Sequence, residues 1–224
     1  MKLTCINGSP RGRSSNSKVL LDRFLDGFRS VENGYTIEEV YLKGGKNHAA
    51  AVKSMETSDI VILAFPLYTD SMPGIVKAFI ETIDLQTFRK PSLKLGFIVQ
   101  SGFPEGHHSI YIKRYLEKLA GRLGVDCLGT IIKGGVEGLQ VQPKWMTRYL
   151  DLFYELGQWL ALEHAFNHDI LDKLEGPEHL KGTRLMAYKL LKVLGLSDFY
   201  WNQQLKENNA YQKRFEKPYS QSIN

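Results

Sequence analysis

Apolar and polar positions alternate in blocks along the first two thirds of the chain. Five short runs rich in apolar and β-branched residues predict strands over residues 2–7, 35–42, 59–65, 93–100 and 126–132. Between these runs, apolar residues recur at helical spacing and predict helices over residues 17–28, 49–57, 75–83 and 110–123. Because alternating strands and helices form right-handed crossovers, we expect a doubly wound, five-stranded parallel sheet between two helical layers.

The pattern changes after the fifth strand. Residues 144–162 predict a long helix that closes the domain, and residues 185–194 predict another helix. The remaining tail is polar, but it carries large apolar side chains, namely Trp201, Leu205, Tyr211 and Phe215. Such side chains need a surface to cover them. We therefore expect a domain over residues 1–165 and a helical extension over residues 166–224, packed on the domain or on a dimer partner.

Composition and charge narrow the class of protein. The 224 residues include 29 basic and 24 acidic side chains, a formal net charge of +5 that is scattered along the chain. This favours small anionic ligands over nucleic acid, because no basic block is present. The two cysteines, Cys5 and Cys127, do not form a disulfide framework or a cysteine metal site. Since no apolar run is long enough for a membrane span, we expect a cytoplasmic protein.

The segment CINGSPRGRSSNSK, residues 5–18, follows the first predicted strand. In a doubly wound sheet, ligands bind beyond the carboxyl ends of the strands, and this loop lies there. Its glycines let the backbone approach a ligand, and its hydroxyls, Arg11 and the amino end of the following helix together suit an anion. The alternative is a plain turn that caps the helix, because Ser and Asn are favoured there for local reasons.

Other phosphate-binding motifs fit this segment less well. The spacings G-x-x-x-x-G-K-[ST] and G-x-G-x-x-G are both absent, which disfavours an NTPase and a dinucleotide fold. Cys5 and Arg11 do have the C-x5-R spacing of a low-molecular-weight phosphatase, in which a thiolate attacks phosphorus. Pro10 removes one amide, Gly12 replaces a hydroxyl residue, and no Asp-Pro pair supplies a general acid. The phosphatase remains a minor alternative.

Three loops together carry a resemblance to a known family. NGSPR followed by SNS, the turn FPLYTDSMPG at residues 65–74, and QSGFPE at residues 100–105 follow the first, third and fourth predicted strands. Over about residues 1–165 the chain resembles the flavodoxin-like NAD(P)H-dependent FMN reductases and quinone reductases. The resemblance implies a flavodoxin-like three-layer sandwich, with strand order 2-1-3-4-5 and FMN as the cofactor.

The resemblance also implies which residues bind FMN. The phosphate-binding residues would be Ser9, Arg11, Ser15, Asn16 and Ser17. The residues along the isoalloxazine ring would be Pro66, Leu67, Tyr68 and Thr69, and those along its pyrimidine side or the ribityl chain would be Ser101, Gly102 and Phe103. Each has a simpler alternative, because Tyr68 and Phe103 also suit ordinary loop anchors and Ser101 suits a turn.

Two positions depart from the family pattern. Thr69 stands where many relatives have tryptophan, and Asp70 stands where they have glycine. Loss of the indole opens the flavin face or leaves it to the tail of a partner subunit, and an acidic Asp70 opposes negative charge near the ring. The cysteine cluster that some relatives carry for an iron–sulfur centre is absent, so we expect no cluster.

The resemblance implies an FMN-dependent oxidoreductase that passes hydride from NAD(P)H through flavin to a quinone, free flavin or similar acceptor. We expect no catalytic side chain and no metal. His107 and His108 are expected to be exposed, and His164 and His168 lack a third ligand. The alternative is an FMN electron-transfer protein that docks to protein partners, although flavodoxins tend to be acidic and this chain is basic. We expect a homodimer whose tail helps to close the flavin cleft.

Overall fold

The structure is a computed structural model, and it describes residues 1–31, 34–45, 47–88, 90–141, 146–193 and 199–217. Five parallel strands form one sheet in the order β2-β1-β3-β4-β5. The strands are β1 (Lys2–Asn7), β2 (Thr36–Tyr41), β3 (Ile60–Pro66), β4 (Lys94–Gln100) and β5 (Asp126–Lys133). This confirms the predicted parallel sheet and its strand order. The central strand β3 is buried at every residue, because helices cover both faces of the sheet.

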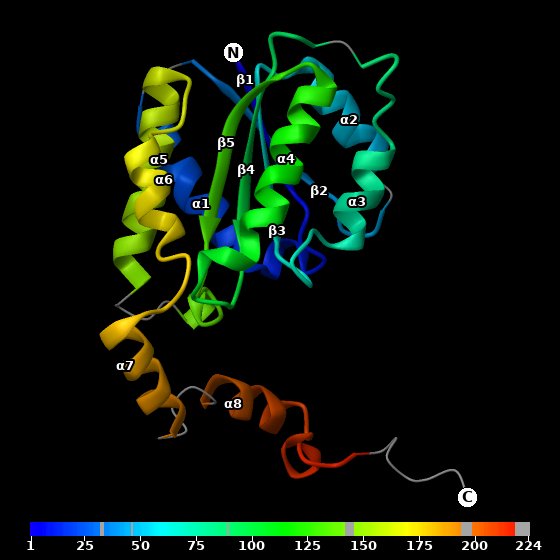
Figure 1. The fold of residues 1–224 in the computed structure, drawn as a ribbon. Helices are drawn as coiled ribbons and strands as arrows, with labels where there is room; N and C mark the ends of the chain where they lie inside the picture. The colour runs from blue at the N-terminus through cyan, green and yellow to red at the C-terminus, as the bar shows by residue number, and fades with distance from the viewer. Residues whose placement is uncertain (32–33, 46, 89, 142–145, 194–198, 218–224) are drawn as a thin grey trace, which may run out of the picture. The chain divides into compact units, whose positions relative to one another are not determined.

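Helices cover the two faces in two groups (Figure 1). One face carries α1 (Asn16–Arg29), α5 (Thr147–Glu163) and α6 (His168–Glu175), and the other carries α2 (His48–Thr57), α3 (Gly74–Glu81) and α4 (Ile110–Leu123). The four helices between the strands agree with their predicted bounds to within two residues. The predicted start of α5 differs more, because residues 144 and 145 lie outside the described part and α5 begins at Thr147.

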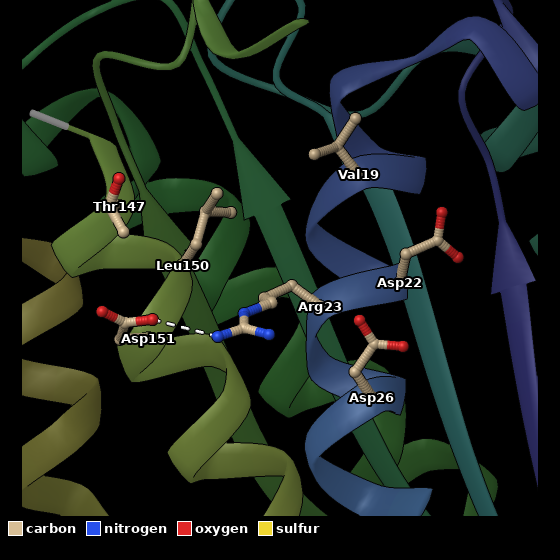
Figure 2. A pocket seen from close by; sticks show the side chains of 7 residues that line it. All are labelled: Val19, Asp22, Arg23, Asp26, Thr147, Leu150 and Asp151. Carbon is tan, nitrogen blue, oxygen red and sulfur yellow. Dashed lines mark hydrogen bonds and ion pairs between the residues drawn. The ribbon is translucent and has the colours of Figure 1, made fainter. Parts of the chain in front are cut away.

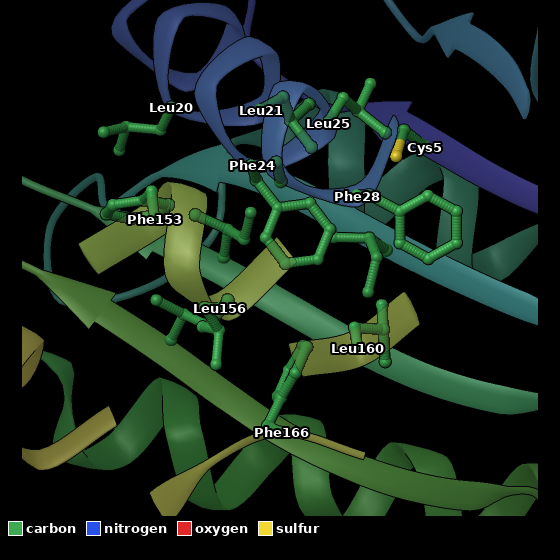
Figure 3. Packing of buried hydrophobic residues seen from close by; sticks show 14 of the residues in the cluster. Cys5, Leu20, Leu21, Phe24, Leu25, Phe28, Phe153, Leu156, Leu160 and Phe166 are labelled. Carbon is green, nitrogen blue, oxygen red and sulfur yellow. The ribbon is translucent and has the colours of Figure 1, made fainter. Parts of the chain in front are cut away.

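The core on the α1 side consists mainly of aromatic and aliphatic side chains from α1, α5 and the sheet (Figure 3). Phe24 and Phe28 on α1 meet Phe153, Leu156 and Leu160 on α5, and all five are fully buried. The helices approach closely because glycines face backbone across the contact. A Cβ on Gly27 would lie 1.9 Å from the Tyr154 carbonyl oxygen, and one on Gly157 would lie 1.9 Å from the Phe24 carbonyl oxygen.

The core on the other face joins α2, α3 and α4 to the sheet. Its fully buried members include Phe65, Phe79, Phe97 and Leu116, which come from two strands and two helices. The two cores pack on opposite faces of the sheet, so the loops at its carboxyl edge project from a rigid base.

The compact unit extends further along the chain than the sequence predicted. It covers Met1–His179, whereas the domain was expected to end at residue 165. The added segment contains α6, which sequence analysis did not predict and which packs on β5 and α5. Its apolar residues are buried in the core on the α1 side, namely Phe166, Ile170, Leu171 and Leu174. The short helix therefore belongs to the sheet domain.

A second unit covers Leu180–Asn224 and is described by itself. It contains α7 (Gly182–Val193), α8 (Phe199–Glu207) and a short 3-10 turn, Tyr211–Lys213. The helix predicted over residues 185–194 corresponds to α7, although residue 194 lies outside the described part. Among the described residues, no helix combines the length and apolar character that crossing a bilayer requires.

Candidate functional site

Loops that follow β1, β3, β4 and β5 border one pocket at the carboxyl edge of the sheet. The pocket has a volume of about 160 Å³. Its lining residues are Ser9, Arg11, Ser15, Asn16, Pro66, Leu67, Tyr68, Gln100, Ser101, Gly102 and Glu137. It therefore lies where open α/β sheets bind their ligands.

The loop after β1 is held by its own side chains. The Asn7 Oδ1 atom accepts from the Ser9 amide at 2.9 Å, and the Ser15 hydroxyl donates to the Gly12 carbonyl at 2.6 Å. Ser15 also caps α1, because its Oγ accepts from the Lys18 amide at 3.2 Å. Gly12 has a φ of 61°, which favours glycine. The capped turn that sequence analysis gave as the alternative is therefore present, and it gives the pocket a preorganised wall.

Three groups of this loop remain suited to an anionic or hydroxylated ligand. The Arg11 side chain is exposed at the pocket, and Ser9 is buried beside it. Asn16 donates through Nδ2 to the Val136 carbonyl at 2.8 Å, while its buried Oδ1 has no hydrogen-bond partner among the described residues. A hydroxyl of a ligand would satisfy this acceptor, and the first amides of α1 lack partners within the helix.

The loop after β3 forms a tight turn. Tyr68 and Ser71 exchange two backbone hydrogen bonds, at 2.8 and 3.1 Å. Thr69 and Asp70 between them have φ values of 50° and 58°, the left-handed region that Asp and Asn tolerate better than most residues. The Leu67 amide donates to the Gln100 carbonyl at 2.7 Å and fixes the turn to β4. Tyr68 thus stands half-exposed at the pocket rim.

The loop after β4 is joined to the loop after β5. The Ser101 amide donates to the Lys133 carbonyl and the Val136 amide donates to the Ser101 carbonyl, each at 3.0 Å. Gly102 has little space beside it, because a Cβ there would lie 2.7 Å from the Glu137 Oε2 atom. Ser101 and Gly102 therefore present backbone and a small hydroxyl to the pocket.

The structure brings nine of the twelve sequence-predicted site residues to this pocket and leaves three out. Ser17 is fully buried, and its Oγ accepts from the Gln100 Nε2 atom at 3.4 Å. Thr69 is exposed on the turn and does not line the pocket. The Phe103 ring is half-exposed and stacks on His108, with ring centroids 4.2 Å apart. These three residues lie next to the pocket and not along it.

Sequence analysis missed two lining residues, Gln100 and Glu137. Gln100 is the last residue of β4 and is buried, a position that the predicted strand already reached. Glu137 follows β5 in the segment GGVEG. The carboxyl ends of all parallel strands lie at one edge of the sheet, so the loop after the fifth strand also reaches the pocket. Glu137, the first acidic residue of that loop, was therefore recognisable from the sequence as a candidate lining residue. Glu137 adds a carboxyl group to the pocket that Arg11 also lines.

Cys5 is not placed for nucleophilic chemistry. Its side chain lies in the core on the α1 side with 1% of its surface exposed (Figure 3). Burial raises the pKa of the Cys5 thiol far above its usual range, and the charge of Glu39 raises it further. Because the thiolate is the reactive form, the structure gives no support to the phosphatase alternative.

Lys133 ends β5 close to the pocket loops. Its Nζ atom donates to the Gly134 carbonyl at 2.8 Å and lies 3.9 Å from the centre of the Tyr149 ring. Burial lowers the pKa of Lys133 to about 8, because desolvation disfavours the charged amine. The Lys133 amine therefore lies in surroundings that disfavour its positive charge.

A larger pocket lies between α1 and α5, away from the strand ends (Figure 2). It has a volume of about 380 Å³, and three aspartates line it together with Val19, Arg23, Thr147 and Leu150. Arg23 reaches across to Asp151 with a 3.0 Å ion pair, while Asp22 and Asp26 stand on α1. Although Thr147 begins α5, three aspartates line the pocket and no glycine loop does, so it does not resemble an anion site.

His164 and His168 are not ligands of one site. His164 ends α5 with a φ of 53°, and its Nδ1 lies 2.9 Å from the Tyr35 hydroxyl. His168 begins α6 and is exposed. The two histidines therefore do not lie on one helix, because a turn separates α5 from α6.

Comparisons with known proteins agree with this architecture. The model of a family described as having a flavodoxin-like fold matches residues 1–150. No curated protein matches the sequence.

Solved structures with a similar fold include three reductases. An NADH:FMN oxidoreductase in its apo form has a TM-score of 0.56 at 16% identity, over 80% of this chain and 96% of that one. An FMN-dependent NADH-azoreductase from Bacillus anthracis, in complex with FMN, has a TM-score of 0.57 at 17% identity, over 72% of this chain and 100% of that one. An NADPH-quinone reductase from P. pentosaceus has a TM-score of 0.54 at 19% identity, over 73% of this chain and 99% of that one. At these identities the likeness concerns the fold.

Proposed function

Because this chain belongs to the flavodoxin-like fold family that its residues 1–150 match, we propose that it is an FMN-dependent oxidoreductase. In this proposal it passes hydride from NAD(P)H through flavin to a quinone, free flavin or similar small acceptor. The three reductases of similar fold support the choice of cofactor and reaction. FMN supplies the hydride chemistry, and the protein supplies binding and orientation.

The observation that carries the proposal is the pocket at the carboxyl edge of the sheet. Its first wall combines Ser9, Arg11 and the amino end of α1, which suit a phosphate. The unpartnered Asn16 Oδ1 suits a hydroxyl donor such as a ribityl group. A polar chain that ends in a phosphate meets both requirements, so the residues present fit FMN.

The second wall suits a flat ring. Pro66 and Leu67 present a short apolar surface, and Tyr68 stands at the rim. Across from them, Ser101 and Gly102 bring backbone close to the pocket without a bulky side chain. We propose that these residues orient the isoalloxazine ring, and that Ser17, Thr69 and Phe103 act from beside the pocket.

We propose that the turn after β3 leaves one face of the ring accessible. Of the turn residues from Tyr68 to Ser71, only Tyr68 lines the pocket. An open face admits a nicotinamide and then an acceptor to the same place in succession. The chain's role is to hold Tyr68 at that rim through the paired backbone bonds with Ser71.

An FMN electron-transfer protein is the alternative, and charge argues against it. Electrostatic steering between protein partners requires complementary charge, and acidic carriers meet basic partners. The formal net charge of this chain is +5. A small anionic co-substrate such as NAD(P)H benefits from positive charge, so the reductase explains the charge better.

The decisive experiment is a visible absorption titration of the purified full chain with FMN, followed by anaerobic addition of NADPH or NADH. We expect saturable FMN binding and bleaching of the flavin band by at least one nucleotide. Binding without bleaching favours the carrier. Absence of FMN binding contradicts both functions.

A further inference from the structure

A carboxylate and two imidazoles gather just after the loop that follows β4. One ligand atom from each of Glu105, His107 and His108 lies within 4.8 Å of the others. The rings of His107 and His108 have centroids 3.8 Å apart, and the His107 Nδ1 atom lies 4.0 Å from the Glu105 Oε2 atom. All three side chains are half-buried, so they are partly shielded and still reachable from solvent.

The segment that carries these side chains is anchored to a distant part of the chain. The Gly106 amide donates to the Pro177 carbonyl at 3.0 Å, and the His107 amide donates to the Glu178 carbonyl at 3.3 Å. Gly106 is buried, and a Cβ there would lie 3.3 Å from the Glu175 Cγ atom. The three side chains therefore project from a backbone that tertiary contacts hold in place.

Both imidazoles have an acceptor on the same ring atom. The His108 Nδ1 atom lies 3.2 Å from the Asp70 Oδ1 atom, and the His107 Nδ1 atom lies 3.3 Å from the Glu178 carbonyl oxygen. A carbonyl or carboxylate oxygen accepts only, so the proton of each neutral ring belongs on Nδ1 and the lone pair on Nε2. Outer contacts of this kind orient the imidazoles that bind metal ions in proteins.

Stacking restricts the two rings further. Phe103 stacks on His108, and the ring of His179 lies on His107 with centroids 4.5 Å apart. The four rings restrain one another's rotation, which lowers the entropy that ligand binding would cost.

We propose that Glu105, His107 and His108 form a site for a divalent transition-metal ion such as Zn²⁺, with the remaining coordination open to water. Imidazole and carboxylate donors together suit Zn²⁺ and its neighbours in the first transition row, whereas Mg²⁺ and Ca²⁺ prefer oxygen alone. Metal–ligand bonds of about 2.0–2.2 Å draw the donor atoms closer together than they stand here. Small adjustments of the three side chains accomplish this, since their donor atoms already lie within 4.8 Å of one another. Sequence analysis expected no metal, because it took His107 and His108 to be an exposed pair and did not place Glu105 and Asp70 beside them, whereas both histidines are half-buried.

The test uses the full chain without a histidine tag and without flavin. Zn²⁺ binding is measured by calorimetry, and Co²⁺ binding is followed by its visible spectrum, which reports coordination geometry. We expect one ion per chain. His107→Ala and His108→Ala should each weaken Zn²⁺ binding by about 100-fold or more, and Asp70→Asn by about 10-fold.

His168→Ala is the matched control, because His168 is exposed on α6 and lies outside the cluster. It should bind Zn²⁺ as the parent chain does. Glu105→Gln keeps the shape of the side chain, so it tests the site even if a histidine variant folds poorly. Zn²⁺ binding that is absent from the parent chain, or unchanged by the cluster substitutions, overturns the proposal. Since no flavin is present, the result is independent of the proposed oxidoreductase function.

Discussion

At the scale of single residues, substitution of Arg11 gives the clearest test of whether the loop after β1 binds a phosphate. Arg11 lines the pocket, whereas Arg13 in the same loop lies over the Tyr41 ring, 5.0 Å from its centre. Removing a hydrogen bond to a charged group costs about 1.5–3 kcal/mol. Arg11→Ala should therefore weaken FMN binding by about 10- to 100-fold, and it should leave riboflavin binding unchanged because riboflavin has no phosphate.

Fluorescence titration of FMN and riboflavin measures this difference directly. Arg13→Ala is the control and should alter neither affinity. Equal loss of both ligands in Arg11→Ala would show that the arginine does not contact the phosphate.

The burial of Lys133 predicts how the stability of the chain depends on pH. Its pKa is lowered from 10.5 to about 8 in the folded chain, so the unfolded chain holds this proton more tightly. Stability therefore rises as pH increases from about 8 to about 10.5, and the cost of burying the charge is fully present below pH 8. Lys133→Met should be more stable than the parent chain at pH 7, by about 1 kcal/mol or more.

Urea unfolding at pH 7 and pH 10 measures both effects. The difference between Lys133→Met and the parent should shrink at the higher pH, because the parent lysine is then neutral when folded. A difference that is constant with pH would mean that the substitution acts through packing alone.

At the scale of elements, the contact between α1 and α5 depends on glycine. The two helices place backbone where a side chain would stand at Gly27 and Gly157. Overpacking a core costs about 1–3 kcal/mol, and backbone moves less readily than a side chain. Gly157→Ala should therefore lower the free energy of unfolding by about 3 kcal/mol.

Gly121→Ala on α4 is the matched control. Gly121 is exposed, and apart from its chain neighbours and the backbone of its own helix, no heavy atom of the described residues lies within 4 Å of a Cβ built there. Alanine at this helical position should stabilise the chain by up to about 1 kcal/mol. Chemical denaturation of both variants gives the comparison, and similar midpoints for the two would contradict the close helix contact.

The elements also show where sequence reasoning succeeded. The strands and most helices were predictable because hydrophobic periodicity is local and directly reflects which face of an element is buried. The short helix α6 was not predicted, although the eight-residue helix α3 was. Its burial depends on Ile170, Leu171 and Leu174 meeting a core formed by distant segments.

At the scale of the whole molecule, the second unit presents an uncovered apolar stripe. Met186, Leu190 and Val193 recur at helical spacing on α7, and all three are exposed. Such a stripe favours a partner surface. We propose that it joins two copies of the chain, as expected for a homodimer whose extension helps to close the flavin cleft.

Removal of residues 180–224 tests this proposal. The shortened chain keeps the entire Met1–His179 unit, so it should remain folded but become monomeric. FMN binding should weaken by less than about 10-fold, because every residue that lines the pocket lies in the first unit. Light scattering after gel filtration and a flavin titration provide the two measurements.

Met186→Ser combined with Val193→Ser, in the full chain, separates the stripe from the rest of the extension. It should weaken the dimer and leave the first unit intact. A dimer that survives the double substitution would exclude the stripe from the interface. A dimer that survives removal of residues 180–224, with unaltered flavin affinity, would exclude a role for the extension in assembly or in the cleft.

The sequence by itself determined the order of the strands and of the helices between them, and it indicated the sheet edge at which a ligand is expected and the loops that reach it. These depend on local periodicity and on the rule that carboxyl ends of parallel strands meet at one edge. Only the tertiary structure decided which side chains face the pocket. Ser17 turns to Gln100 in the core, Glu137 enters from the loop after β5, and Asn16 is held by Val136. A side chain's direction within a loop depends on contacts with residues far along the chain, and no local pattern records those contacts.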